Sequence, residues 1–273
     1  RAVIKVMASD VVVRGFEVIG GADGIMVDCS TVPHRNVKIR DNIVHGMKNI
    51  DSNFGIGIIA WGACTAITIG NNTVSDCDRQ GIYVGYSSPM GTTQCAIVDN
   101  TIHDNGQSTQ GHFDNAAPFG IEIHIADRTE VRDNHVYAHL KSSNVKTDGV
   151  GIRVWGDRNM ISGNDIHGND KGIFVYSGNN LAINGNTIYK NRDGVVFSSW
   201  GGVANADKNT YCLNTSYALV NKRPGVAISA EKSWWGATGG PDANLTGAQK
   251  TSGLVDTTGY LKTPPLAGPC HLP

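Results

Sequence analysis

A short motif in which glycine precedes alternating apolar residues returns eight times along this chain. The copies are Gly24-Ile-Met-Val, Gly57-Ile-Ile-Ala, Gly81-Ile-Tyr-Val, Gly120-Ile-Glu-Ile, Gly151-Ile-Arg-Val, Gly172-Ile-Phe-Val, Gly194-Val-Val-Phe and Gly225-Val-Ala-Ile. An asparagine returns with it, at positions 22 to 34 residues apart: Asn42, Asn72, Asn100, Asn134, Asn164 and Asn186. Self-similarity at this period indicates a solenoid, in which each repeat packs only on its neighbours.

The shortest interval, 22 residues, fits one coil of a right-handed parallel β-helix with about three short strands. Leucine-rich repeats would need regularly spaced leucines, and helical repeats would need a period of about 3.6 residues; the sequence has neither. We therefore predict an all-β chain that forms a right-handed parallel β-helix of about eight coils over residues 1–230. Residues 231–273 are expected to form an irregular C-terminal cap, in which Trp234 and Trp235 cover the open end.

Charge and hydropathy exclude some classes of partner. The 273 residues have a formal net charge of -1 and only 17% are charged, whereas a nucleic-acid-binding domain needs a basic surface. No apolar run approaches the roughly 20 residues of a membrane-spanning helix. We therefore expect no nucleic-acid partner and no membrane span.

The cysteines bear on both stability and localisation. None forms a Cys-x-x-Cys pair, which argues against a zinc site. Their positions suggest three disulfides, with six small buried side chains as the alternative: Cys29 with Cys64, Cys77 with Cys95, and Cys212 with Cys270. Disulfides, together with Asn-x-Ser/Thr sequons, are compatible with a protein that is secreted or held at the cell surface.

The chain begins directly in a strand-like run, residues 2–6, with neither a cap nor an export signal. We expect a mature or trimmed fragment of a longer protein, in which further coils could precede residue 1. An uncapped strand edge could stack end to end with another chain or support an oligomer.

The repeated asparagines are assigned a structural role. We expect each to lie inward at a tight turn, in the left-handed backbone conformation that asparagine tolerates. Its amide would bond to the equivalent residue one coil above and below, as in stacked asparagine ladders. No chemistry is assigned to these residues.

Strand alternation predicts which side chains point outward together. In Gly-Ile-x-Val-x the isoleucine and valine face the core, so both x positions face solvent. Adjacent coils stack about 4.8 Å apart, so the x residues of successive coils form two parallel outward columns. The first column is Met26, Ile59, Tyr83, Glu122, Arg153, Phe174 and Val196. The second is Asp28, Trp61, Gly85, His124, Trp155, Tyr176 and Ser198.

This face is the candidate site. We expect it to expose five aromatic rings that stack on sugar rings: Trp61, Tyr83, Trp155, Phe174 and Tyr176. His112 is expected to reach the same face from a loop. Long excursions within residues 43–56, 103–119 and 137–150 would form the walls of a cleft around Glu122, His124 and Arg153. The alternative is a plain cross-strand ion pair with aromatics packed beneath loops.

One reaction uses these residue types together, the β-elimination of a polysaccharide that contains uronic acid. The C5 proton beside a carboxylate becomes removable when a cation neutralises the carboxylate and a base lies nearby. Arg153 would bind the carboxylate, and Lys146 or His124 would act as the base. Glu122 or Asp148 would orient these groups. The expected partner is therefore an acidic polysaccharide.

The repeat resembles the right-handed parallel β-helix, pectin-lyase-like proteins that act on carbohydrates, over roughly residues 2–230. Gly151-Ile-Arg-Val-Trp-Gly-Asp-Arg-Asn-Met-Ile-Ser-Gly-Asn164 is similar to coils of the alginate lyase and chondroitinase B group. Phe119-Gly-Ile-Glu-Ile-His124 is loosely similar to that group's Asn-Gly-x-Glu-x-Ile-Arg coil, with His124 near the expected arginine. The resemblance implies a lyase that uses lysine and arginine, with Ca²⁺ as the candidate cofactor.

Two other functions stay open. A non-catalytic glycan-binding or assembly protein would use the same coils without chemistry. A glycoside hydrolase or epimerase would share the scaffold: Thr147-Asp-Gly149 resembles one motif of the polygalacturonase-like hydrolases, but their second paired-aspartate motif is absent, as is the Asp-Pro-His motif of mannuronan epimerases.

Overall fold

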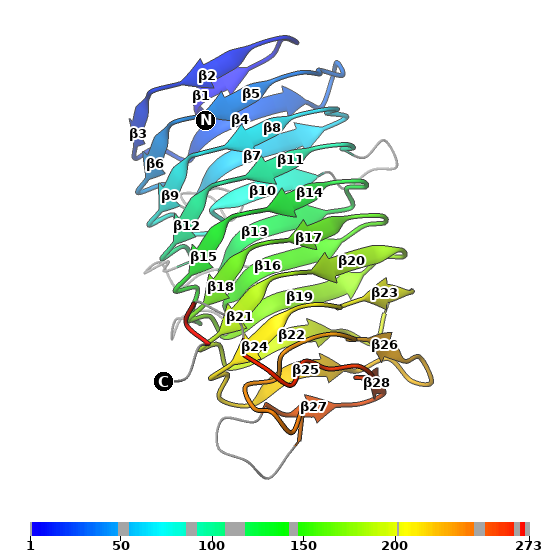
Figure 1. The fold of residues 1–273 in the computed structure, drawn as a ribbon. Helices are drawn as coiled ribbons and strands as arrows, with labels where there is room; N and C mark the ends of the chain where they lie inside the picture. Colours follow the sequence, from blue (N-terminus) through cyan, green and yellow to red (C-terminus); the bar gives the residue numbers. More distant parts are fainter. Residues whose placement is uncertain are drawn as a thin grey trace.

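The computed structural model describes residues 2–48, 55–85, 92–106, 118–141, 147–200, 202–242, 249–264 and 268–270. Within these ranges the regular structure consists of strands, which pair in parallel in three sheets (Figure 1). Over residues 2–229 successive strands belong to sheets A, B and C in turn, so the chain winds as a solenoid. The predicted all-β, right-handed parallel β-helix with three short strands per coil is confirmed.

Sheet A contains β1 (Ala2–Val6), β4 (Asp23–Cys29), β7 (Ile56–Gly62), β10 (Ile82–Gly85), β13 (Phe119–His124), β16 (Val150–Trp155), β19 (Lys171–Ser177), β22 (Asp193–Phe197), β25 (Tyr217–Asn221) and β27 (Thr251–Ser252). Sheet B contains β2 (Val12–Arg14), β5 (Lys38–Arg40), β8 (Thr68–Gly70), β11 (Ala96–Val98), β14 (Glu130–Arg132), β17 (Met160–Ser162), β20 (Leu181–Asn184), β23 (Ala204–Asn205), β26 (Ile228–Ser229) and β28 (Val255–Asp256). Sheet C contains β3 (Glu17–Ile19), β6 (Ile43–His45), β9 (Thr73–Ser75), β12 (Thr101–His103), β15 (His135–Tyr137), β18 (Asp165–His167), β21 (Thr187–Tyr189) and β24 (Thr210–Cys212).

The glycine motif marks the strands of sheet A, with one exception. The apolar residue after each glycine is fully buried and stacks in one inward column: Ile25, Ile58, Ile82, Ile121, Ile152, Ile173 and Val195. Glycine is needed at the corner because a Cβ on Gly120 would lie 2.6 Å from the carbonyl oxygen of Gly151. The eighth copy, at Gly225, lies instead between β25 and β26, so β25 takes its place in the sheet.

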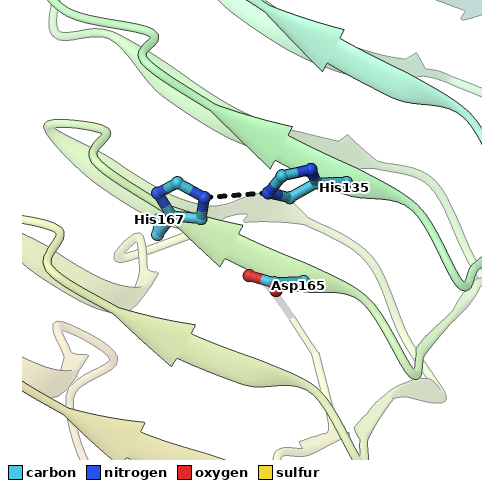
Figure 2. A group of neighbouring side chains, drawn as sticks. All are labelled: His135, Asp165 and His167. Carbon is cyan, nitrogen blue, oxygen red and sulfur yellow. Dashed lines mark hydrogen bonds between the residues drawn. The ribbon is translucent and has the colours of Figure 1, made fainter. Parts of the chain in front are cut away.

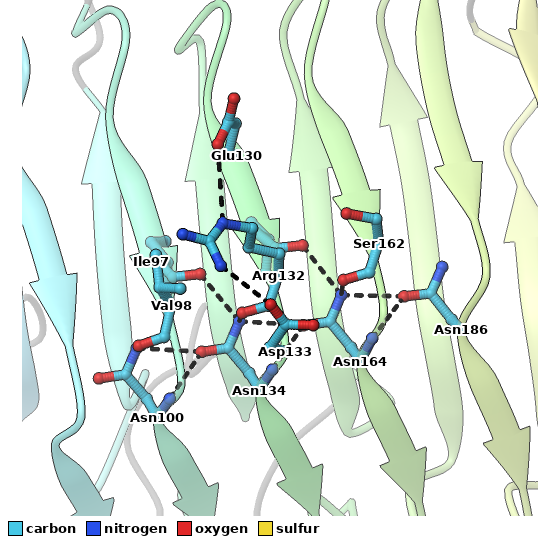
Figure 3. A network of polar contacts seen from close by, with 11 residues as sticks. Ile97, Val98, Asn100, Glu130, Arg132, Asp133, Asn134, Ser162, Asn164 and Asn186 are labelled. Carbon is cyan, nitrogen blue, oxygen red and sulfur yellow. Dashed lines mark hydrogen bonds and ion pairs between the residues drawn. The ribbon is translucent and has the colours of Figure 1, made fainter.

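The asparagine ladder predicted from the sequence is present and internal (Figure 3). The Asn134 amide nitrogen donates to the Asn164 Oδ1 at 2.9 Å and to the carbonyl of Ile97 at 2.9 Å, while its Oδ1 accepts from the Asn100 amide at 3.0 Å. The left-handed conformation belongs to the preceding residue, for example Asp133 with φ 58°, so its assignment to the asparagine was wrong. The turn is therefore made one residue earlier, and the asparagine side chain is free to point inward.

A second internal ladder, which the sequence analysis did not identify, follows the strands of sheet C. Its members bond side chain to side chain through Asn105, His139, Asn169, Asn191, Asn214 and Gln249. His139 replaces an asparagine here, and its Nδ1 lies 2.9 Å from the Asn169 Oδ1. From the coil of Asn105 to that of Asn214, the solenoid is thus held at two corners by buried polar side chains whose hydrogen-bonding groups are paired.

Two of the three expected disulfides form, Cys29–Cys64 and Cys212–Cys270. The third is wrong, since Cys77 and Cys95 are free and buried. Cys77 follows β9 of sheet C and bonds to Asn105, whereas Cys95 precedes β11 of sheet B, so each fills the core at a different corner. Cys77 and Cys95 are therefore small buried side chains, which was the alternative to a disulfide.

The two tail tryptophans point to opposite sides of the chain. Trp235 stacks on Tyr211 within the main core at 4.7 Å, while Trp234 packs with the Cys212–Cys270 disulfide. The tail also adds β27 and β28 to sheets A and B, which continues the stack. No helix in the described part of the chain is long and apolar enough to cross a membrane.

Candidate functional site

The outer face of sheet A carries the two columns that strand alternation predicted. The register pairs Tyr83 with Glu122, Glu122 with Arg153, and Gly85 with His124. The second column shifts at one place, because a β-bulge pairs Trp155 with Ser177 instead of Tyr176. The Tyr176 ring still lies 5.0 Å from the Trp155 ring, so the rings remain neighbours.

The expected exposure of this face is wrong for two central residues. Tyr83 is 7% exposed and Glu122 is 3% exposed. Tyr83 packs with Ile56 and Ile59 in a small apolar cluster outside the main core. The other aromatic and charged residues of the face are half-buried, because bulky side chains of adjacent coils cover one another.

The aromatic side chains form one continuous row along the helix axis. Centroid distances between neighbouring rings are 5.7 Å from Trp61 to Tyr83, 5.8 Å from Tyr83 to His124, 4.7 Å from His124 to Trp155 and 6.4 Å from Tyr176 to Phe174. The row crosses coils far apart in sequence. It joins the predicted sugar-binding aromatics to the predicted catalytic His124.

Glu122 is the hub of the polar groups on this face. Its Oε1 accepts from the Arg153 Nη1 and lies 3.1 Å from the His124 Nδ1, and its Oε2 accepts from the Gln80 Nε2 at 2.5 Å. Burial by itself would raise the pKa of Glu122, but the hydrogen bond from His124, the charge of Arg153 and the Gln80 amide together hold that pKa below its ordinary value. Glu122 is therefore a buried, ionised carboxylate.

This charge state fixes the tautomer of His124. An ionised carboxylate only accepts hydrogen bonds, so the His124 Nδ1 carries the proton in the 3.1 Å contact. The Arg153 Nη1, 3.5 Å from the same nitrogen, also only donates and therefore makes no bond there. In the neutral ring the Nε2 atom is then an acceptor that can take a proton.

The guanidinium of Arg153 is held among aromatic rings as well as by Glu122. Its Cζ lies 5.1 Å from the Tyr176 ring centroid and 5.5 Å from that of Phe119. A second arginine, Arg79, interacts electrostatically with Glu122 and is half-buried. Two cations beside one carboxylate make this the part of the face best suited to an anionic group.

The remaining predicted site residues are placed differently. Asp148 is bound by Lys171 at 2.6 Å and Arg192 at 3.0 Å, so it forms a separate ion cluster at the start of the strands. Burial opposes ionisation of Asp148, but these two cations hold its pKa at about 2. Lys146 and His112 lie outside the described residues, as do parts of all three excursions expected to form the walls.

Three residues that bond to, pack on or interact electrostatically with the site were not identified from the sequence: Gln80, Phe119 and Arg79. Gln80 and Phe119 each precede a motif glycine, and strict alternation would point such residues inward because they lie two positions before an inward isoleucine. The corner at the glycine breaks the alternation. The residue before each motif glycine could therefore have been predicted to reach this face. Lys171 occupies the same position before Gly172, and its Nζ lies 5.0 Å from the Phe174 ring centroid.

Comparison with known proteins places the chain by its fold. Residues 57–232 match the sequence family described as the right handed beta helix region. No curated protein matches the chain significantly in sequence.

Several solved structures are similar in fold. Three of them are the enzymatically active domain of bacteriophage CBA120 tailspike protein 2 (12% identity, TM-score 0.68, covering 94% of this chain and 42% of that one), the DFA-IIIase of Arthrobacter chlorophenolicus A6 (13%, 0.61, 93% and 60%) and the mannuronan C-5 epimerase A-module of Azotobacter vinelandii (16%, 0.52, 86% and 65%). At these identities the similarity shows the fold alone. The chain spans less than two thirds of the length of each.

Proposed function

The chain belongs to the family of proteins with a right-handed β-helix region, and from this premise we propose that it cleaves an acidic polysaccharide by β-elimination on the outer face of sheet A. The observation that carries the proposal is the Glu122 hub, which holds Arg153 and His124 side by side. One buried carboxylate thereby orients both a cation and a base. β-Elimination beside a uronic carboxylate needs that pair of groups.

In the proposed step Arg153 binds the carboxylate of a uronic residue and stabilises the negative charge that develops when the C5 proton leaves. The His124 Nε2 takes the C5 proton. The electron pair of the broken C–H bond forms a double bond between C4 and C5, and the oxygen at C4 leaves with its chain and takes a proton from water. Glu122 stays ionised throughout and stabilises the imidazolium that forms.

Hydrolysis by two carboxyl groups has less support on this face. Such a mechanism needs one protonated carboxylic acid beside an ionised partner. Glu122 and Asp148 both have lowered pKa values, because each is bound by cations. Neither would donate a proton near neutral pH.

The structural neighbours support a carbohydrate as the substrate class. The enzymatically active domain of a tailspike, a DFA-IIIase solved in complex with GF2, and a mannuronan C-5 epimerase share the fold. An epimerase that acts at C5 would need the same proton abstraction, followed by return of a proton to the other side. The two disulfides favour secretion or display at the cell surface, where such polymers occur.

The test is an incubation with alginate, pectate, chondroitin and dermatan, with and without Ca²⁺, following the ultraviolet absorbance of the unsaturated uronate. We expect product on at least one polymer and its loss in Arg153→Ala and His124→Ala. Arg132→Ala is the matched control, because Arg132 belongs to the same coil as His124 but lies exposed on sheet B.

Other outcomes separate the remaining functions. Incorporation of solvent deuterium at C5 without cleavage would identify an epimerase, and reducing ends without unsaturation would identify a hydrolase. Glycan binding without any product would leave a binding or assembly protein. Each of these results would reject β-elimination.

A further inference from the structure

The outer face of sheet C carries a cluster of histidines and tyrosines that the proposed function does not use. The strands after the first asparagine ladder follow the same alternation as sheet A, and their outward residues stack in register. His135 pairs with Asp165, and Tyr137 pairs with His167, which pairs with Tyr189. Two adjacent coils therefore place His135, Asp165 and His167 at one spot (Figure 2).

The three side chains converge through their ligand atoms. The Nε2 atoms of His135 and His167 are 2.9 Å apart, and a carboxylate oxygen of Asp165 completes a group whose members lie within 4.8 Å of one another (Figure 2). None of the three residues is fully buried. The Asp165 Oδ1, by contrast, is a buried atom that has no hydrogen-bond partner. A buried, unpaired carboxylate oxygen is costly unless something else binds it.

We propose that His135, Asp165 and His167 form a binding site for a divalent first-row transition metal ion of the Zn²⁺ type. Two nitrogens bound to one tetrahedral Zn²⁺ lie about 3.3 Å apart, given Zn–N bonds of about 2.0–2.1 Å. The rings need to separate by only a few tenths of an ångström from their present distance. Three protein ligands leave a position for water or for a ligand atom.

Neighbouring side chains hold the ligands in place. Tyr137 stacks on His167 with ring centroids 5.1 Å apart and planes inclined by 3°, and it contacts His135 at 4.6 Å. On the other side Tyr189 stacks on His167 at 4.7 Å, and burial together with the nearby Asp165 carboxylate raises the pKa of Tyr189 to about 12. Partners that fix the orientation of metal ligands are a common feature of metal sites.

The ligand set agrees with this kind of metal, which binds the neutral imidazole ring and the ionised carboxylate. Two imidazoles and one carboxylate suit Zn²⁺, Cu²⁺ or Ni²⁺, whereas Ca²⁺ and Mg²⁺ prefer oxygen ligands. The absence of Cys-x-x-Cys pairs does not bear on a site of this composition.

The site is tested by titrating tag-free, metal-stripped protein with Zn²⁺ in a calorimeter, and with Co²⁺ in a visible spectrophotometer. We expect one saturable Zn²⁺ per chain, and Co²⁺ absorption typical of a four- or five-coordinate ion. His135→Gln, Asp165→Asn and His167→Gln should each weaken Zn²⁺ binding about 100-fold or more, and Tyr189→Phe about tenfold, since loss of a supporting partner typically costs 10–100-fold.

His45→Gln is the matched control, because His45 stands in the same outward column as His167 but lies several coils away beside Glu17. It should bind Zn²⁺ like the unaltered protein. The proposal would be overturned if all three ligand variants bound Zn²⁺ as tightly as the unaltered protein, or if the unaltered protein showed no stoichiometric binding. Circular dichroism of each variant verifies that the β-helix is intact, and the Co²⁺ spectrum of the unaltered protein tests the site without any substitution.

Discussion

Arg153 lies directly beside Glu122 on the neighbouring strand, and its guanidinium donates to a carboxylate that is only 3% exposed. The pair is therefore both part of the candidate site and part of the packing of the sheet. Losing one partner leaves the other charge buried without its counter-ion, which generally costs more than the pair contributes. Stability and activity can thus be separated only by comparing several variants.

Arg153→Met should destabilise the protein by about 3 kcal/mol, the lower end of the range for one lost partner of a buried pair. Glu122→Gln in the same background should recover part of this loss, because it removes the unpaired charge. Urea unfolding of the single and double variants measures both effects. Arg132→Met, on an exposed ion pair, should change the unfolding free energy by less than about 0.5 kcal/mol; an equally small effect of Arg153→Met would contradict the buried pair.

His139 should make stability depend on pH. Burial lowers the pKa of His139 from 6.5 to about 4. Its Nε2 accepts from the Asn105 amide, so a proton on Nε2 would place two hydrogen-bond donors against each other. Because the folded pKa lies below the unfolded value, the neutral form stabilises the fold above about pH 6.5, and this contribution is lost as the pH falls toward 4. The loss is on the order of 3 kcal/mol.

His139→Asn provides the comparison, because asparagine occupies the same ladder position in the next coil. Urea unfolding at a series of pH values should show a shallower decline for this variant than for the unaltered protein between pH 6.5 and 4. Parallel curves would show that His139 does not titrate in this range upon unfolding.

Asn134→Leu should be among the most destabilising substitutions in the chain. It removes the side-chain amide that bonds to Ile97 and Asn164, and it leaves the Asn100 backbone N–H without its acceptor, the Asn134 Oδ1. Each buried group left unpaired costs about 1–3 kcal/mol, so a loss of more than about 3 kcal/mol is expected. Asn205→Leu, on an exposed strand position, is the control and should be nearly neutral in thermal unfolding. A mild effect at both positions would argue against the ladder.

The cysteines should fall into two classes. Without reductant, the native protein should not react with a thiol reagent, because Cys77 and Cys95 are buried and burial raises the pKa of each thiol to about 12. After unfolding, two thiols per chain should react. The paired Cys29→Ser/Cys64→Ser variant should lose about 4 kcal/mol, as expected for a closed loop of 35 residues. Four or more thiols in the unfolded chain would show that at least one of the two disulfides is absent.

Much of the fold could be predicted from residue spacing. The positions of Gly24 to Gly194 mark seven successive strands of sheet A, and the ladder from Asn42 to Asn186 sets the register of sheets B and C. The pattern failed at Gly225, where no strand of sheet A begins, and at the Trp155 bulge. Both departures depend on how one coil fits the next, which spacing within a single repeat does not report.

The candidate site was only partly readable. Alternation brought Glu122, His124 and Arg153 onto one face, and the structure places them in contact. It did not show that Glu122 is buried, nor that Gln80 reaches it from 42 residues earlier. The ion pairs that separate Asp148 from the other site residues were equally invisible, because Lys171 and Arg192 come from later coils.

The sequence by itself determined the period of the coil, its inward residues and the columns that share an outer face, because a strand alternates sides whatever surrounds it. Only the tertiary structure decided which outward residues are buried, which ionisable groups meet and which cysteines pair. Those properties depend on side chains that adjacent coils bring within a few ångströms across 22 to 34 residues of chain. The Glu122 hub and the His135, Asp165 and His167 cluster both arise in this way, each assembled from residues that no short stretch of sequence contains.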